Sequence, residues 1–173
     1  ALEIGFPVSV KTSVDRCIAY NSTDLKEFLS RVDTNNDKIL IEKYYIGVGV
    51  DIYAICDGEG CLVPCIYEHI ERAGVNAGDS ISVSPPITLP RKVQQEIVDY
   101  ALKLSSKLGV RGILNIEFIY YDNDIYLIHA QTGDAKGIPF VSKATGLKIT
   151  QIASECTLGK SLSELGFSYG LFD

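Results

Sequence analysis

Short segments in which apolar and polar residues alternate occupy the first quarter of the chain. Phe6–Ser13 and Arg16–Ser22 follow this pattern, and so does Lys38–Tyr45. Alternation with a period of two is typical of strands that bury one face, and Pro7 is acceptable at the start of a strand. We therefore expect three strands here, with the first two joined as a hairpin across a very short connection.

A different periodicity separates the second and third of these segments. Apolar residues recur there at helical spacing, and Thr23 and Asp24 are suited to the start of a helix. Thr34–Asp37 has the composition of a turn. The residues that share one helical face are Leu25, Phe28, Leu29 and Val32. The order predicted for this part is therefore strand, strand, helix, strand.

The remainder of the chain is longer and more apolar. Gly47 and Gly49 predict a flexible junction, so we place a domain boundary between residues 1–47 and 48–173. Beyond the boundary, Val50–Glu71 contains two strand-like runs around an Asp-Gly-Glu-Gly turn, which predicts an antiparallel hairpin. A Gly-rich loop then leads to a short strand that is ended by two prolines.

The most regular helical pattern extends from Arg91 to Leu108, and Gly109 supplies a C-terminal stop. The remaining expected elements are two strands in Gly112–Ala130 that turn at Asp122–Asp124, and two helices at Lys148–Gly159 and Lys160–Gly166. Together these elements predict the α+β fold class, with mostly antiparallel strands and helices that cover one face of the sheet.

Composition excludes several function classes. The 173 residues carry a net charge of −6 with a pI of about 4.9, and the lysines and arginines form no basic stripe that could displace counterions from phosphates. No apolar run is long enough to span a bilayer. We therefore expect neither a nucleic-acid partner nor a membrane partner. The chain also contains no methionine, which favours a piece of a longer protein.

The five cysteines and the lack of a signal peptide at the start favour reduced thiols and a cytoplasmic location. Cys56, Cys61 and Cys65 follow the pattern C-x4-C-x3-C, a spacing that admits a zinc site. Two of the three lie in strand-like runs, in which alternate side chains diverge. Buried structural thiols are therefore the favoured interpretation.

Polar residues at the ends of two neighbouring strands form the candidate site. Glu117 lies in one expected strand, and His129 and Gln131 lie two residues apart in the next, so the latter two share a face. Oxygen atoms in such a place could bind a divalent cation. The alternative is a solvent-facing Glu117 and a His129 that is an ordinary polar residue at a strand end. Spacing alone favours this alternative.

A series of short phrases gives the chain a family resemblance. In chain order they are EIGFPVSVK, DIYAICDG, YEHIERAGVNAGDS, KLGVRGILNIEF, YLI, PFVSKATG and GKSLSELG. They extend from Glu3 to Gly166, and in this order they resemble the ATP-grasp portion of the large subunit of carbamoyl phosphate synthetase. The phrase at Ala73–Ser80 followed by PFVSKATG points to this family more than to other ATP-grasp enzymes.

The resemblance implies an ATP-grasp fold in which residues 1–47 form the B lobe, a lid over a nucleotide held against a C lobe of residues 48–173. It implies phosphorylation of carbamate or bicarbonate by Mg-ATP, in pyrimidine and arginine biosynthesis. The protein's part in such a reaction is to place cations and donors that neutralise phosphoryl charge. The implied partners are the nucleotide, the remaining large-subunit domains and a glutaminase small subunit.

The resemblance also assigns nucleotide-binding positions. Lys11 stands where the family has an arginine against the phosphates. Lysine keeps the positive charge but lacks the planar guanidinium group that can donate two parallel hydrogen bonds. Gly49 stands in place of a glutamate that meets the ribose. After Ser13 the family's Gly-rich phosphate-covering loop does not follow. The implied cofactor-binding residues are Lys11, Glu42, Gly74, Val75 and Asn76, of which the last replaces a histidine.

The implied metal ligands are Glu117, His129 and Gln131. Glu117 replaces a glutamine, which exchanges one oxygen ligand for another. His129 replaces a metal-bridging glutamate, and Gln131 replaces an asparagine. Gly133 replaces an arginine of the phosphate site, whereas Lys136 retains a cation at the second arginine position and is the implied catalytic residue. Loss of a hard, charged ligand from between two magnesium ions weakens their binding.

Two function hypotheses from different classes follow. In the first, the chain belongs to an ATP-dependent ligase of the carbamoyl phosphate synthetase type. In the second, it is a degenerate, non-catalytic ATP-grasp module with a structural or regulatory role in a larger assembly. Magnesium-dependent binding of nucleotide would separate them.

Overall fold

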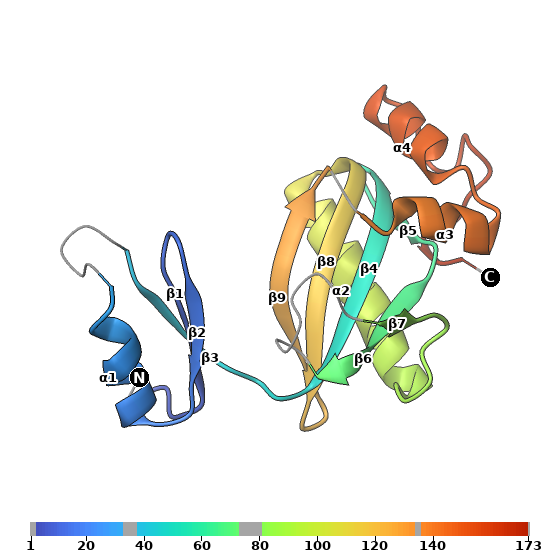
Figure 1. The fold of residues 1–173 in the computed structure, drawn as a ribbon. Helices are drawn as coiled ribbons and strands as arrows, with labels where there is room; N and C mark the ends of the chain where they lie inside the picture. The colour runs from blue at the N-terminus through green and yellow to red at the C-terminus, as the bar shows by residue number, and fades with distance from the viewer. Residues whose placement is uncertain (1–2, 33–37, 73–80, 134–135, 173) are drawn as a thin grey trace. The chain divides into compact units, whose positions relative to one another are not determined.

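The computed structural model describes residues 3–32, 38–72, 81–133 and 136–172 (Figure 1). The chain divides into two compact units, Ala1–Ile46 and Gly47–Asp173. Each unit has its own buried core. Assignment of these units to a lid lobe and a C lobe stays a prediction.

The first unit is a three-stranded antiparallel sheet with one helix. Its elements are β1 (Val8–Lys11), β2 (Arg16–Ala19), α1 (Ser22–Leu29) and β3 (Leu40–Lys43), and the strand order is β2-β1-β3. The Asn21 side chain caps α1 by accepting hydrogen bonds from the backbone N–H groups of Thr23 and Asp24. Phe28 packs from the helix against the sheet. The predicted order of elements is confirmed, and the turn expected at 34–37 lies outside the described residues.

The second unit is built on a seven-stranded sheet with β4 at its centre. The strands are β4 (Val48–Asp57), β5 (Cys61–Val63), β6 (Ile66–Arg72), β7 (Ser82–Val83), β8 (Arg111–Tyr121), β9 (Asp124–Thr132) and β10 (Gly170–Leu171). β4 pairs antiparallel with β5 and β6 on one edge and with β8 on the other, and β9 continues the sheet beyond β8 (Figure 1). β10 is parallel to β5.

Two of the sequence predictions for these strands need correction. Gly49 lies within β4 rather than in a flexible junction, because its backbone pairs with Ile119 of β8. The second arm of the expected hairpin is two strands, β5 and β6, since they are separated by Pro64 and Cys65. Proline has no N–H to donate to a ladder, which accounts for the interruption.

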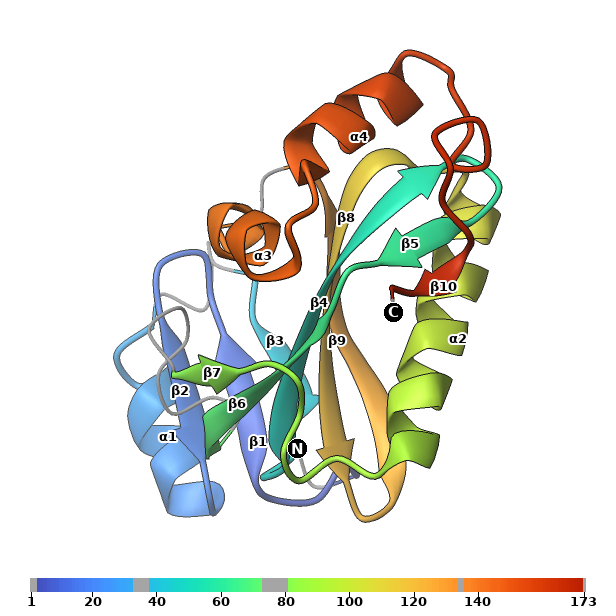
Figure 2. The ribbon, with the colours of Figure 1, turned by 90° about the vertical axis from the view of Figure 1, so that its right-hand side faces the viewer.

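Helices cover both faces of the sheet and not one, as Figure 2 shows for α2 (Arg91–Leu108) and α3 (Ile138–Thr145). α2 packs on the face that carries Val50, Ile52 and Ala54 of β4. α3 and α4 (Ile149–Thr157) pack on the opposite face around Ile55 and Leu62. β4 is an interior strand whose far end is buried on both sides, so it requires cover on both.

The C-terminal part was predicted only in part. α2 has the predicted bounds, and Gly109 ends it in the left-handed conformation at φ 59°. The helix expected at Lys160–Gly166 is instead a series of turns over residues 162–166. Leu162 is fully buried and its backbone N–H donates to the Asp57 carboxylate at 2.8 Å, so tertiary contacts replace a helical pattern here. In the described residues, no helix is long and apolar enough to cross a membrane.

Candidate functional site

The candidate site is a polar face of the second unit's sheet, on the side of the sheet that does not pack against α2. We define the polar face by Asp51 and Tyr53 of β4, His69 of β6, Asn115 and Glu117 of β8, and His129 and Gln131 of β9. Side chains alternate along β4, and Val50, Ile52 and Ala54 point to α2. Asp51 and Tyr53 therefore point to the other face. The register of β4, β8 and β9 then places these residues in two cross-strand rows: Asp51, Glu117 and His129 in one, and Tyr53, Asn115 and Gln131 in the other.

A β-bulge in β9 turns His129 and Gln131 towards this polar face. Phe118 is opposite Leu127, whereas the next pair is Glu117 with His129, so Ile128 is an extra residue. Ile125 packs against the α2 core before the bulge, and Ala130 packs against it afterwards. Without the extra residue, His129 would face α2, because side chains alternate strictly along a regular strand.

His69 and Asp51 form the closest pair on the polar face. His69 Nε2 lies 2.9 Å from Asp51 Oδ2, and the two side chains are 24% and 22% exposed. The hydrogen bond to Asp51 raises the pKa of His69; burial opposes this rise, and the charges of Asp51, Glu117 and Glu71 add to it. A Cβ atom on residue 49 would lie 3.2 Å from His69 Cγ, so Gly49 gives the ring room to lie across β4.

The other predicted metal ligands lie together in these rows. His129 Nε2 is 3.2 Å from the amide oxygen of Gln131, and both residues are exposed. Glu117 is half-buried between Asp51 and His129. The buried Asn115 Oδ1 has no hydrogen-bond partner among the described residues. The structure thus brings Glu117, His129 and Gln131 to one surface, and their role as metal ligands stays a prediction.

Lys136 is exposed and precedes the start of α3. The next residue, Gly137, lies against Tyr53 of the polar face: a Cβ there would be 2.4 Å from Tyr53 Cε2. Burial raises the pKa of Tyr53, the charges of Asp51 and Glu117 raise it further, and a hydrogen bond from the Gly137 N–H lowers it. Tyr53 therefore anchors the segment that carries Lys136 to the sheet.

Two predicted nucleotide-binding residues belong to the first unit. Lys11 Nζ and Glu42 Oε2 form an ion pair at 2.7 Å between the neighbouring strands β1 and β3. The β1–β2 connection is tight, since the Thr12 N–H donates to the Asp15 carbonyl at 2.8 Å. The remaining predicted contacts, Gly74, Val75 and Asn76, lie outside the described residues.

The donor chemistry of the polar face suits magnesium only in part. Glu117 and Gln131 offer the hard oxygen ligands that magnesium prefers, while the His129 imidazole does not. Within the described ranges no group of three or more His, Cys, Asp and Glu side chains is placed to hold a metal ion. Of the three cysteines whose spacing admits a zinc site, Cys56 and Cys61 are buried opposite each other in β4 and β5.

The sequence did not predict that Asp51, Tyr53, His69 and Asn115 belong to the site. A signal for Asp51 was present, since it alternates with Val50 and Ile52 and so belongs to the other face of the strand. No comparable signal shows that His69 crosses Gly49, because that contact depends on the pairing of β4 with β6.

The likeness of the chain to solved structures shows that its class is the ATP-grasp fold. The chain is similar to the biotin carboxylase domain of a single-chain bacterial carboxylase, with a TM-score of 0.75 and 15% identity over 97% of this chain and 37% of that one. It is also similar to a biotin carboxylase from Campylobacter jejuni, with a TM-score of 0.76 and 21% identity over 93% and 39%. At these identities the likeness shows the fold.

Sequence comparison gives the family. Residues 1–165 match the model of the carbamoyl-phosphate synthase L chain, ATP binding domain. The chain is 40% identical to the carbamoyl phosphate synthase large chain of Lachnoclostridium phytofermentans and 38% identical to that of Agathobacter rectalis, in both cases over 99% of this chain and 17% of the relative. The chain therefore belongs to the carbamoyl-phosphate synthase large-chain ATP-binding domain family. It spans about one sixth of the length of these relatives.

Proposed function

We propose that this chain binds Mg-ATP on the polar face, within a longer large chain that phosphorylates bicarbonate or carbamate. The observation that carries the proposal is that two oxygen ligands, Glu117 and Gln131, lie on neighbouring strands of the polar face in a chain of an ATP-binding domain family. A structure similar to this chain, the biotin carboxylase domain of a Hydrogenobacter thermophilus carboxylase, was determined with MgADP and bicarbonate (TM-score 0.75, 19% identity over 93% of this chain and 38% of that one).

In this proposal the predicted residues other than His129 have a chemical role. Glu117 and Gln131 hold a magnesium ion through oxygen, and the bound ion supplies charge neutralisation for the nucleotide phosphates. Asp51 lies next to Glu117 in the cross-strand row, and together with its partner His69 it sets the local charge. Lys136 offers its ammonium group to the transferred phosphoryl group. In the first unit, Lys11 offers a second cation to the phosphates.

The remaining assignments rest on the family resemblance. Glu42, Gly74, Val75 and Asn76 contact the nucleotide. The other domains of the large chain and a glutaminase small subunit are the protein partners, and the location is the cytoplasm. Phosphoryl transfer to a carboxylate-type oxygen then depends on placement of the acceptor beside the nucleotide, since proximity contributes much of such a rate enhancement.

A second candidate function, a non-catalytic ATP-grasp module, is favoured by three contacts. The His129 imidazole lies against the Gln131 oxygen that would bind magnesium. The Lys11 charge is already paired with Glu42. The β1–β2 connection is a tight turn where the family resemblance implies a phosphate-covering loop. Each of these contacts weakens phosphate or metal binding and leaves the scaffold intact.

Calorimetric titration separates the two candidates. ADP and a non-hydrolysable ATP analogue are titrated into the chain with and without magnesium, and then into the double variant His129→Glu, Gln131→Asn. The first candidate predicts magnesium-dependent binding by the unmodified chain, tightened at least about tenfold in the double variant. Binding that appears only in the double variant supports the non-catalytic module.

A matched control keeps the result specific. Glu96→Gln changes a carboxylate on α2, away from the polar face, and leaves the affinity unchanged, whereas Glu117→Ala removes the magnesium dependence. If neither the chain nor the double variant binds nucleotide while both remain folded, the nucleotide-binding proposal is wrong.

A further inference from the structure

A cavity of about 220 Å³ lies on the other side of the sheet from the polar face, between α2 and the β8–β9 hairpin. Its floor is Phe118 of β8, and its walls are Leu104 of α2 with Ile125 and Leu127 of β9. The nucleotide proposal uses none of these residues. The cavity is therefore a separate feature of the second unit.

The cavity is open to solvent at the β9 edge of the sheet. Leu127 precedes the extra residue Ile128 and faces α2, yet it is 52% exposed. Among the described strands β9 pairs with β8 alone, so no further strand covers this edge. Tyr100 of α2 borders the opening and is 45% exposed, with its ring centroid 6.5 Å from that of Phe118. Apolar surface left open in a concave site is the usual ground for ligand binding.

Two lysines give the opening a positive charge. Lys103 and Lys107 are one helical turn apart on α2, and both line the cavity. Lys103 Nζ lies 5.7 Å from the centroid of the Tyr100 ring. Neither lysine forms an ion pair with an acidic side chain in the described part of the chain. In a protein of net charge −6, this local excess of cations selects for an anion.

We propose that this cavity binds a small amphipathic carboxylate, with its hydrocarbon chain against Phe118 and Leu127 and its carboxylate between Lys103 and Lys107. Each ammonium group donates a charge-assisted hydrogen bond to the carboxylate. The cavity holds the liquid volume of about seven water molecules, which suits a chain of roughly six to ten carbons. The occupant is a free small molecule, and its affinity falls in the millimolar range or somewhat tighter for this size.

Displacement of a fluorescent dye tests the charge preference. Anilinonaphthalene sulfonate, an aromatic anion that fluoresces in apolar sites, is bound first, and octanoate or octylammonium is then added at millimolar concentration. Both competitors have the same hydrocarbon chain, so only the head group differs. The proposal predicts that octanoate displaces the dye at about one tenth of the octylammonium concentration. Equal displacement by the two, or none by octanoate, overturns it.

Variants then place the binding site. Lys103→Gln together with Lys107→Gln weakens octanoate binding about tenfold, and Leu127→Trp, which fills the cavity, removes it. Lys92→Gln is the matched control, because Lys92 lies in the first turn of α2 and contacts Glu96 rather than the cavity. Thermal unfolding confirms that each variant is folded. Octanoate binding that survives both the double lysine variant and Leu127→Trp overturns the proposal.

Discussion

The two faces of the second unit's sheet are formed by the same strands but differ in chemistry. On the α2 face, Ile52 and Ile116 are fully buried and pair across β4 and β8. One residue earlier in β4, Asp51 points to the polar face and meets Glu117. The alternation of a single strand thus separates the buried apolar face from the polar face on which we propose that nucleotide binds. Substitutions of neighbouring residues should consequently differ in kind and not only in size.

The largest effect on stability is expected on the α2 face. Ile52→Ala leaves a cavity in a fully buried cluster, so it should lower the free energy of unfolding by about 3–5 kcal/mol. Ile52→Val removes one methylene and should cost about 1 kcal/mol. Urea unfolding followed by circular dichroism measures both. A loss below 1 kcal/mol for Ile52→Ala would mean that the α2 face is not the main source of stability.

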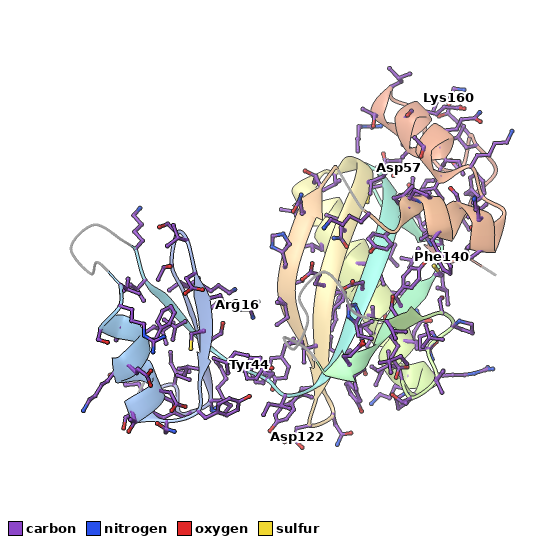
Figure 3. The ribbon with its side chains drawn as sticks, viewed as in Figure 1. Arg16, Tyr44, Asp57, Asp122, Phe140 and Lys160 are labelled. Carbon is purple, nitrogen blue, oxygen red and sulfur yellow. The ribbon has the colours of Figure 1, made fainter. Side chains whose placement is uncertain are left out.

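Asp57 is the position at which the division between the faces breaks down. Asp57 points to the same face of β4 as Asp51, yet it is only 2% exposed, at the end of the strand near α4 (Figure 3). Its carboxylate accepts hydrogen bonds from the backbone N–H of Leu162 at 2.8 Å and from the Tyr169 hydroxyl at 3.0 Å, besides those of the β4–β5 turn. A charged group here therefore has a structural role.

Asp57→Asn should lower the free energy of unfolding by about 2–3 kcal/mol near neutral pH. Burial alone would raise the pKa of Asp57, but hydrogen bonds from Leu162, the turn and Tyr169 lower it overall. Its stabilising contribution is therefore present above the unfolded pKa of about 3.9 and is lost as pH falls through the lower folded pKa. Urea titrations at several acidic pH values should show a flatter pH dependence for Asp57→Asn than for the parent.

Gly137 tests how the polar face is joined to α3. Its φ of −77° suits any residue, so Gly137→Ala introduces no backbone strain. The added methyl group would, however, lie 2.4 Å from the Tyr53 ring, and we expect a loss of about 1–2 kcal/mol. In a Tyr53→Ala background the same substitution should cost much less. A double-mutant cycle without coupling would contradict this contact.

Local sequence signals predicted the elements that depend on nearby residues. The bounds of α2 follow from its apolar periodicity and from Gly109, and the β8–β9 turn follows from Asp122 and Asn123, which adopt φ values of 52° and 64°. Figure 3 shows Asp122 at the tip of this hairpin. In each case the residues that determine the conformation are adjacent in sequence.

The features that the sequence did not predict depend on distant partners. The run at 160–166 has helical composition, but Leu162 donates to Asp57, which lies over a hundred residues earlier. The bulge at Ile128 is set by the pairing of β9 with β8, and no local residue type marks it. The candidate site was predicted to the extent that Glu117, His129 and Gln131 share a surface. Asp51 and His69 complete that surface through the pairing of β4 with β6.

The smallest expected effect concerns the His69–Asp51 pair on the polar face. The hydrogen bond to Asp51 raises the pKa of His69, so the pair's contribution is fully present below the unfolded pKa of about 6.5 and is lost as pH rises through the folded value. Both side chains are about one quarter exposed, which limits the contribution to about 1 kcal/mol or less. The contribution of this pair on the polar face should thus fall with rising pH.

Two variants should remove this slope in the same way. His69→Gln and Asp51→Asn each eliminate the ion pair, so the free energy of unfolding measured near pH 6 and near pH 9 should differ less than in the parent. Glu117 and Glu71, the other carboxylates that act on His69, remain in both variants. His129→Gln is the matched control, because it replaces the chain's second histidine, which lies within hydrogen-bond distance of the neutral Gln131. A pH dependence of the free energy of unfolding that instead disappears in His129→Gln and persists in His69→Gln would contradict the assignment to the His69–Asp51 pair. That result would require a different account of the charge balance around Glu117.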